Sequence, residues 1–106
     1  MTVRELLDIV DFTKKNEVSD ELKIRWINDV EGRVQCEIHR ISPDKVARVV
    51  SENDVLSVPD PYASLYMLFV VSMIEFSEGD YTNYARLTAE FEKSLVMYAK
   101  FVIRGA

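Results

Sequence analysis

The amino-acid sequence predicts an all-α protein with a four-helix bundle-like domain that ends in a long antiparallel helical hairpin. Three observations support this prediction. Apolar residues recur at helical spacing in four stretches. Side chains that commonly cap helices precede several of these stretches. The last two stretches are joined only by Gly79 and Asp80. The 106 residues fit the size of one domain, which we take as residues 1–106.

The first helix is expected from Thr2 to about Lys14. Thr2 and Glu5 have the spacing of a capping box, in which each side chain accepts a hydrogen bond from a free N–H group of the first turn. The expected apolar stripe consists of Val3, Leu6, Leu7 and Val10. We interpret Asp8 and Asp11 as part of a solvated acidic face rather than as metal ligands.

The second helix is expected from Ser19, its N-cap, to about Ile41. Its apolar residues recur at spacings of three or four and are Leu22, Trp26, Val30, Val34, Ile38 and Ile41. Gly32 costs about 1 kcal/mol there relative to alanine, so we expect either a bend or close packing. We interpret Trp26 as a core residue rather than a binding hot spot, because it lies on the stripe.

The third and fourth helices are expected from Tyr62 to about Glu78 and from Tyr81 to about Arg104. The third helix is apolar on nearly every side and must be enclosed, whereas the fourth has one apolar stripe. Gly79 suits the left-handed position that ends a helix, and the Asp80 side chain can cap the next one. So short a joint requires the two helices to be antiparallel.

The segment from Ser42 to Pro61 permits two interpretations. One is a short β-hairpin with strands near Lys45–Val50 and Val55–Val58. The other is a helical turn followed by extended chain. Nearly twenty residues between helices exceed the usual connection length, and such segments are often functional. We therefore expect a partner interface at its apolar residues, which are Val46, Val49, Val50, Val55, Leu56 and Val58.

The sequence does not support an enzyme. With one histidine, no glycine-rich phosphate loop and no nucleophile elbow, no residue is assigned as catalytic, cofactor-binding or metal-binding. Cys36 and His39 lie three apart, but no second pair completes a metal site. We therefore interpret Cys36 as a packing or surface residue and His39 as a surface or helix-end residue. The single cysteine is consistent with a reducing compartment, and the N-terminus has no signal-peptide pattern, so we expect a cytoplasmic protein.

Charge and hydropathy argue against two further classes of protein. The net charge of −5 argues against a surface that neutralises nucleic-acid phosphates. The longest apolar run, Leu65–Ile74, is well short of the roughly 20 residues that a membrane span needs.

Three stretches of the chain together form a familiar pattern. They are Glu21–Arg33, which contains Arg-Trp; Val55–Tyr66, which contains Val-Pro-Asp-Pro-Tyr; and Phe76–Tyr81, which contains Gly-Asp-Tyr. In this combination the sequence from Ser19 onward resembles the small head-tail connector (head-completion adaptor) proteins of tailed bacteriophages and prophages.

The resemblance implies a helical protein that assembles as a ring beneath the portal of a phage capsid and extends the DNA channel towards the tail. The implied partners are the portal protein and a tail-side completion protein, and DNA would pass through without specific binding. The implied location is the cytoplasm of the bacterial host during assembly, and then the head-tail junction of the virion. No contact residue is carried over from the family.

The residues alone also permit a different class of protein. A small acidic helical module, similar to an antitoxin or an anti-repressor, would sequester one protein partner through its charged surface. This alternative predicts a small closed oligomer with one tight partner.

Overall fold

A computed structural model describes residues 1–105 of the chain. Within them it contains four α-helices, which are α1 (Val3–Thr13), α2 (Asp20–Arg33), α3 (Ser64–Ser77) and α4 (Tyr81–Ile103). A π-helix, η1 (Val34–Ile38), continues α2, and a 3-10 turn, η2 (Pro43–Lys45), lies in the connection to α3. The predicted all-α class is confirmed.

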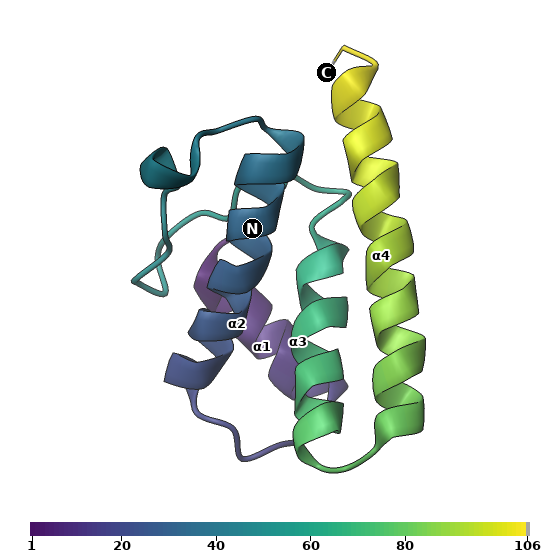
Figure 1. The fold of residues 1–106 in the computed structure, drawn as a ribbon. Helices are drawn as coiled ribbons and strands as arrows, with labels where there is room; N and C mark the ends of the chain where they lie inside the picture. Colours follow the sequence, from purple (N-terminus) through teal and green to yellow (C-terminus); the bar gives the residue numbers. More distant parts are fainter. Residues whose placement is uncertain (106) are drawn as a thin grey trace.

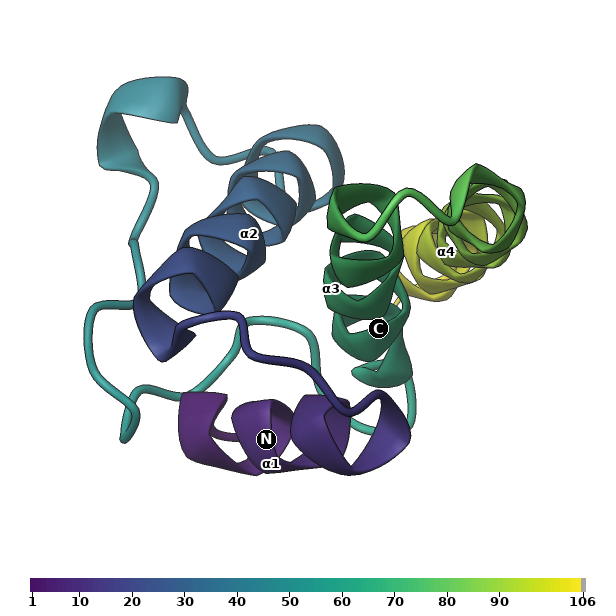
Figure 2. The same ribbon diagram turned by 90° about the horizontal axis from the view of Figure 1, so that it is seen from below.

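Helix α3 lies at the centre of the molecule. Figure 1 shows α2, α3 and α4 side by side, with α4 antiparallel to α3. Figure 2 shows α1 crossing beneath α2 and α3, while α4 lies at the far side of α3. Helix α4 therefore packs mainly on α3, and α3 is covered by all three other helices. This explains why α3 is apolar on nearly every side whereas α4 has a single buried stripe.

The core lies between α1, α2 and α3 and extends into the α3–α4 contact. The expected stripe of α1 is fully buried, and Trp26 is a core residue with 8% of its surface exposed. The residues that α2 and α4 contribute include Ile27, Val30, Leu87, Phe91, Leu95 and Tyr98. Leu22 is an exception to the predicted stripe, because it lies in the first turn of α2 and is 39% exposed.

The helix caps predicted from the sequence are confirmed. The Thr2 hydroxyl accepts from the Glu5 N–H group and the Glu5 carboxylate accepts from the Thr2 N–H group, which completes the capping box. Ser19 caps α2 and Asp80 caps α4, each by accepting from the third N–H group of its helix. Gly79 has φ +82°, the left-handed conformation that favours glycine.

Two helix boundaries differ from the prediction. The α-helical part of α2 ends at Arg33 and a π-turn follows, so the helix stops at Ile38 rather than Ile41. Arg40 then adopts φ +60°, which lets the Ile41 N–H group donate to the Gln35 carbonyl at 2.8 Å and closes the helix. Nothing lies within 4 Å of a Cβ atom built on Gly32, so close packing does not explain this glycine.

Helix α3 begins at Ser64 rather than at Tyr62. The Tyr62 N–H group donates to the Pro59 carbonyl at 2.9 Å, and the Leu65 N–H group donates to the Tyr62 carbonyl at 3.3 Å. Both bonds span three residues, so the chain enters α3 through tight turns instead of α-helical ones.

The β-hairpin interpretation of the connection between the second and third helices is wrong. Within residues 1–105 the one isolated β-bridge joins Thr2 and Val55, and the stretches Lys45–Val50 and Val55–Val58 do not pair with each other. The alternative interpretation, a helical turn followed by extended chain, describes the segment, because η2 is followed by extended backbone at Val46. The physical reason is that helical side chains and the N-terminus already satisfy its backbone groups, as described next.

Candidate interaction surfaces

Two amide side chains, one from α2 and one from η1, hold the connecting segment (residues 39–63). Asn28 donates to the Val49 carbonyl and accepts from the Val49 N–H group, both at 2.9 Å. Gln35 makes the same pair of bonds with Ala47, at 2.8 and 2.9 Å. Each side-chain amide thus makes the two backbone hydrogen bonds that a neighbouring β-strand would otherwise make. The segment is therefore fixed without forming a sheet.

The N-terminus of α1 holds the same segment from its other side. The N–H groups of Val3 and Arg4 donate to the carbonyls of Asp54 and Glu52, at 3.0 and 2.8 Å. The Leu56 N–H group donates to the Met1 carbonyl at 2.9 Å. The first N–H groups of a helix have no hydrogen-bond partner within the helix. These contacts therefore satisfy backbone N–H groups of α1 and backbone carbonyls of the segment at the same time.

A buried carboxylate anchors the end of the segment. Glu31 is 2% exposed and accepts from the Ser57 N–H group at 3.0 Å, from the Ser57 hydroxyl at 2.7 Å and from the Tyr66 phenol. The Tyr66 oxygen in turn accepts from the Val58 N–H group at 2.9 Å. Burial, together with the neighbouring negative charge of Glu31, raises the pKa of the Tyr66 phenol. This network joins α2, α3 and the segment.

The structure divides the six residues of the expected partner interface into two groups. Val49, Leu56 and Val58 are buried in the core, with 5% or less of their surface exposed, and Val46 is half-buried. Val50 and Val55 are 81% and 69% exposed. Only the last two present most of their apolar surface to a partner in this conformation.

Sequence reasoning missed the three side chains that position this segment, which are Asn28, Glu31 and Gln35. A signal for them exists in the sequence. They are polar and lie at spacings of three and four, so they form a polar stripe beside the apolar stripe of the same helix. Such a stripe in a buried helix predicts that it binds backbone groups of a neighbouring segment.

The C-terminal end of α4 forms a second candidate surface. Helix α4 has 23 residues and α3 has 14, so the last turns of α4 extend past the start of α3 (Figure 1). We call residues 94–104 the α4 overhang. Its large exposed apolar residues are Val96 (51%), Met97 (62%), Phe101 (40%) and Ile103 (80%).

The inner side of the α4 overhang is held by the connecting segment. The Tyr98 hydroxyl lies 2.7 Å from His39 Nε2, and the Tyr62 and Phe101 rings have centroids 4.9 Å apart. Beside them is a hollow of about 300 Å³, lined by Pro61, Tyr62, Ser64, Ser94 and Met97. His39 is thus half-buried and bonded to α4, in addition to ending the π-turn as a helix-end residue.

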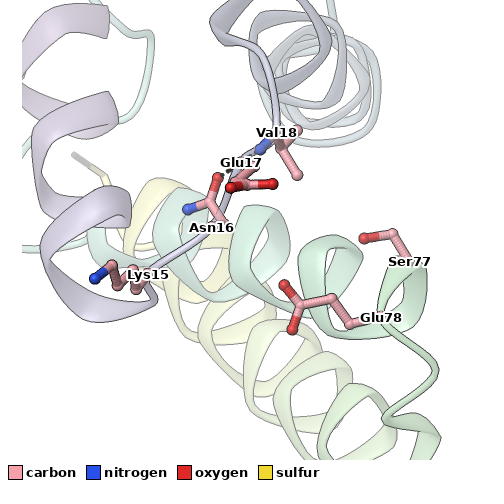
Figure 3. Close-up of a pocket in the computed structure, with 6 residues that line it drawn as sticks. All are labelled: Lys15, Asn16, Glu17, Val18, Ser77 and Glu78. Atoms are coloured by element: carbon pink, nitrogen blue, oxygen red, sulfur yellow. Dashed lines mark hydrogen bonds between the residues drawn. The ribbon is translucent and has the colours of Figure 1, made fainter.

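A larger surface hollow of about 520 Å³ lies between the α1–α2 connection and the end of α3 (Figure 3). It is lined by Lys15, Asn16, Glu17, Val18, Ser77 and Glu78. Asn16 is engaged in the turn itself, since it donates to the Lys14 carbonyl and accepts from the Val18 N–H group. Glu78 pairs with Lys14 at 3.2 Å. These groups are explained by the local fold, and we assign no ligand to this hollow.

Among residues 1–105, no group of three or more His, Cys, Asp or Glu side chains is placed to hold a metal ion. No helix in this part of the chain has both the length and the apolar character needed to cross a membrane.

Comparison with known proteins gave no significant match to a protein-family model, to a curated protein or to a solved structure.

Proposed function

We propose that this protein is a structural head-tail connector of a tailed phage or prophage, which assembles as a ring beneath the portal and extends the DNA channel towards the tail. The observation that supports the proposal most strongly is the α4 overhang. A helix end that exposes four large apolar side chains within one short stretch is typical of a surface that a protein partner covers.

The sequence motifs that resemble connector proteins lie at structurally important places. Trp26 is buried in the core face of α2, whereas Arg25 beside it is exposed. Pro59 and Pro61 are at the turns that enter α3, and Gly79 ends that helix. They therefore support the fold expected of a connector. The motifs do not identify the residues that contact partner proteins, which we assign from the exposure of apolar side chains.

We propose that the portal protein and a tail-side completion protein are the neighbours in the virion. Val50 and Val55 are the exposed apolar residues of the connecting segment, and we propose that they contact one of these neighbours. The net charge of −5 favours a channel through which DNA passes without specific binding, because like charges repel the phosphates.

The test is co-sedimentation of the protein with portal-bearing, tailless capsids assembled from the same source genome, followed by imaging of the vertex. Saturable binding at one vertex, with a visible ring, is the expected result. The double variant Val50→Glu and Val55→Glu should weaken this binding, because both side chains would lose apolar contact with the neighbour. Tyr81→Ser is the control, since this exposed residue lies at the opposite end of α4 from the overhang.

A failure to bind such capsids, or a source genome that encodes no portal, would overturn the proposal. The acidic helical regulatory module would then be the better explanation. It predicts a small closed oligomer and one tight partner outside any capsid.

A further inference from the structure

We infer that the α4 overhang is the docking site for the outer face of α1 of a second copy of this chain. This inference rests on the proposed function, because it assigns the contact by which copies would join into a ring.

The outer face of α1 is the most exposed apolar feature at the N-terminal side of the molecule. Phe12 is 94% exposed and Ile9 is 39% exposed, and both lie off the buried stripe of the helix. An aromatic ring that is almost wholly in water is a candidate anchor, because burying it in a partner recovers its full hydrophobic free energy.

Within α1, the exposed charged side chains near Phe12 are acidic; Lys15, just past the end of the helix, is also exposed. The exposed charged residues of α1 on this side are Glu5, Asp8 and Asp11. Asp8 pairs with Arg4 at 3.1 Å yet keeps 69% of its side chain exposed, and Asp11 keeps 46% exposed while it pairs with Lys23 at 2.6 Å. The surface that receives this face should therefore be apolar and basic.

The α4 overhang has this combination. Its residues Lys100 and Arg104 are exposed, as is Lys93 just before it, and the stretch 93–104 contains no Asp or Glu. All 18 acidic residues of the chain lie outside this stretch. A basic, apolar surface on an otherwise acidic protein matches the α1 outer face in both properties, so a second copy supplies its complement.

The two surfaces lie on different sides of the molecule. Figure 2 shows α1 beneath α2 and α3, and α4 at the far side of α3. When two copies join through these unlike surfaces, the pair still has one free α1 outer face and one free α4 overhang. Further copies can therefore add head to tail. Such contacts close into a ring when the rotation between copies permits. Two helix faces form a small interface, so we expect the free protein to associate weakly and reversibly.

The test uses one variant for each surface. Phe12→Ser removes the anchor of α1, and Met97→Ser removes the central apolar side chain of the overhang; both positions are mostly exposed, so the fold should be retained. Sedimentation velocity over a wide range of concentration should show association of the original protein. Each variant should weaken this self-association about tenfold or more. An equimolar mixture of the two variants should form a dimer and nothing larger. The Phe12 variant keeps an intact overhang and the Met97 variant keeps an intact α1 face, so only one contact can form.

Tyr81→Ser is the control, because Tyr81 lies at the other end of α4 and is as exposed as Met97, at 62%. This variant should associate like the original protein. Lys100→Glu is a second overhang variant that should weaken association through charge alone. A protein that stays monomeric throughout, variants that associate normally, or a mixture that does not pair would each overturn the inference.

The self-association test and the capsid-binding test can fail independently of each other. Binding to portal-bearing capsids without any pairing of the two variants would overturn this contact and leave the connector proposal intact. Pairing of the variants without capsid binding would overturn the connector proposal and leave the contact intact.

Discussion

Tyr66 donates its phenolic hydrogen to Glu31 in the interior of the protein, where the two residues are 0% and 2% exposed. The two residues belong to α3 and α2, and the connecting segment completes the network through Ser57 and Val58. A buried carboxylate is tolerated because three donors face it, which compensates for the hydration it has lost. This network is thus a specific junction between the helices and the surface segment.

Glu31→Gln should destabilise the protein by about 1 to 3 kcal/mol, although the side chain keeps its shape. A glutamine has one acceptor oxygen and adds two donors, whereas the site presents three donors to the side chain. Urea unfolding measures the change. Glu37→Gln is the matched control, because this side chain is 59% exposed and should change stability by less than about 0.5 kcal/mol. Equal effects of the two variants would contradict the junction.

Asn28→Ala should release the middle of the connecting segment. It removes both hydrogen bonds to the Val49 backbone and should cost about 1 to 3 kcal/mol. Limited proteolysis should then cut near Val49 faster than in the original protein. Asn53→Ala, at an exposed position of the same segment, provides the comparison. Unchanged cleavage in the Asn28 variant would mean that the segment is held mainly by its buried apolar residues.

Two glycines should respond to substitution in opposite directions. Gly79→Val should destabilise the protein by about 1 to 2 kcal/mol, because φ +82° places a β-branched side chain in a strained conformation. Gly32→Ala should stabilise it by about 0.5 to 1 kcal/mol, because Gly32 is helical and nothing lies within 4 Å of its added Cβ atom. Thermal unfolding of both variants shows whether each substitution raises or lowers the stability of the protein. A neutral Gly79 variant would contradict the strained helix end.

Stability should fall in acid partly through Glu75. Hydrogen bonds from Lys14 and then from Asn83 lower the pKa of this carboxyl below its ordinary value of 4.5. The folded protein therefore binds the proton less readily than the unfolded chain. The stabilisation is complete above about pH 4.5 and is lost as the pH falls through the folded-state pKa.

The measurement for Glu75 is urea unfolding at a series of pH values below neutrality. The original protein should lose more stability on acidification than Glu75→Gln, which has no proton to bind at this site. Lys14→Met should reduce the acid sensitivity in the same way, because the ion pair at 2.8 Å would be absent. Parallel pH profiles for all three proteins would show that Glu75 does not contribute.

The sequence by itself determined the features that depend on neighbours within a few residues. The capping box of Thr2 and Glu5, the Asp80 cap and the left-handed Gly79 are local arrangements of backbone and side chain, so short motifs predict them. The all-α class and the burial of the α1 stripe follow from periodicity for the same reason.

Only the tertiary structure decided the conformation of the connecting segment and the surfaces that remain exposed. The valines of this segment form one pattern in the sequence, yet Val49 is buried and Val50 is exposed, because Asn28 holds the backbone of Val49 from a helix about twenty residues earlier. Likewise, the α4 overhang exists because α4 extends beyond α3 at the end opposite their joint. Local patterns do not encode such contacts, since they depend on which distant groups meet after the helices pack.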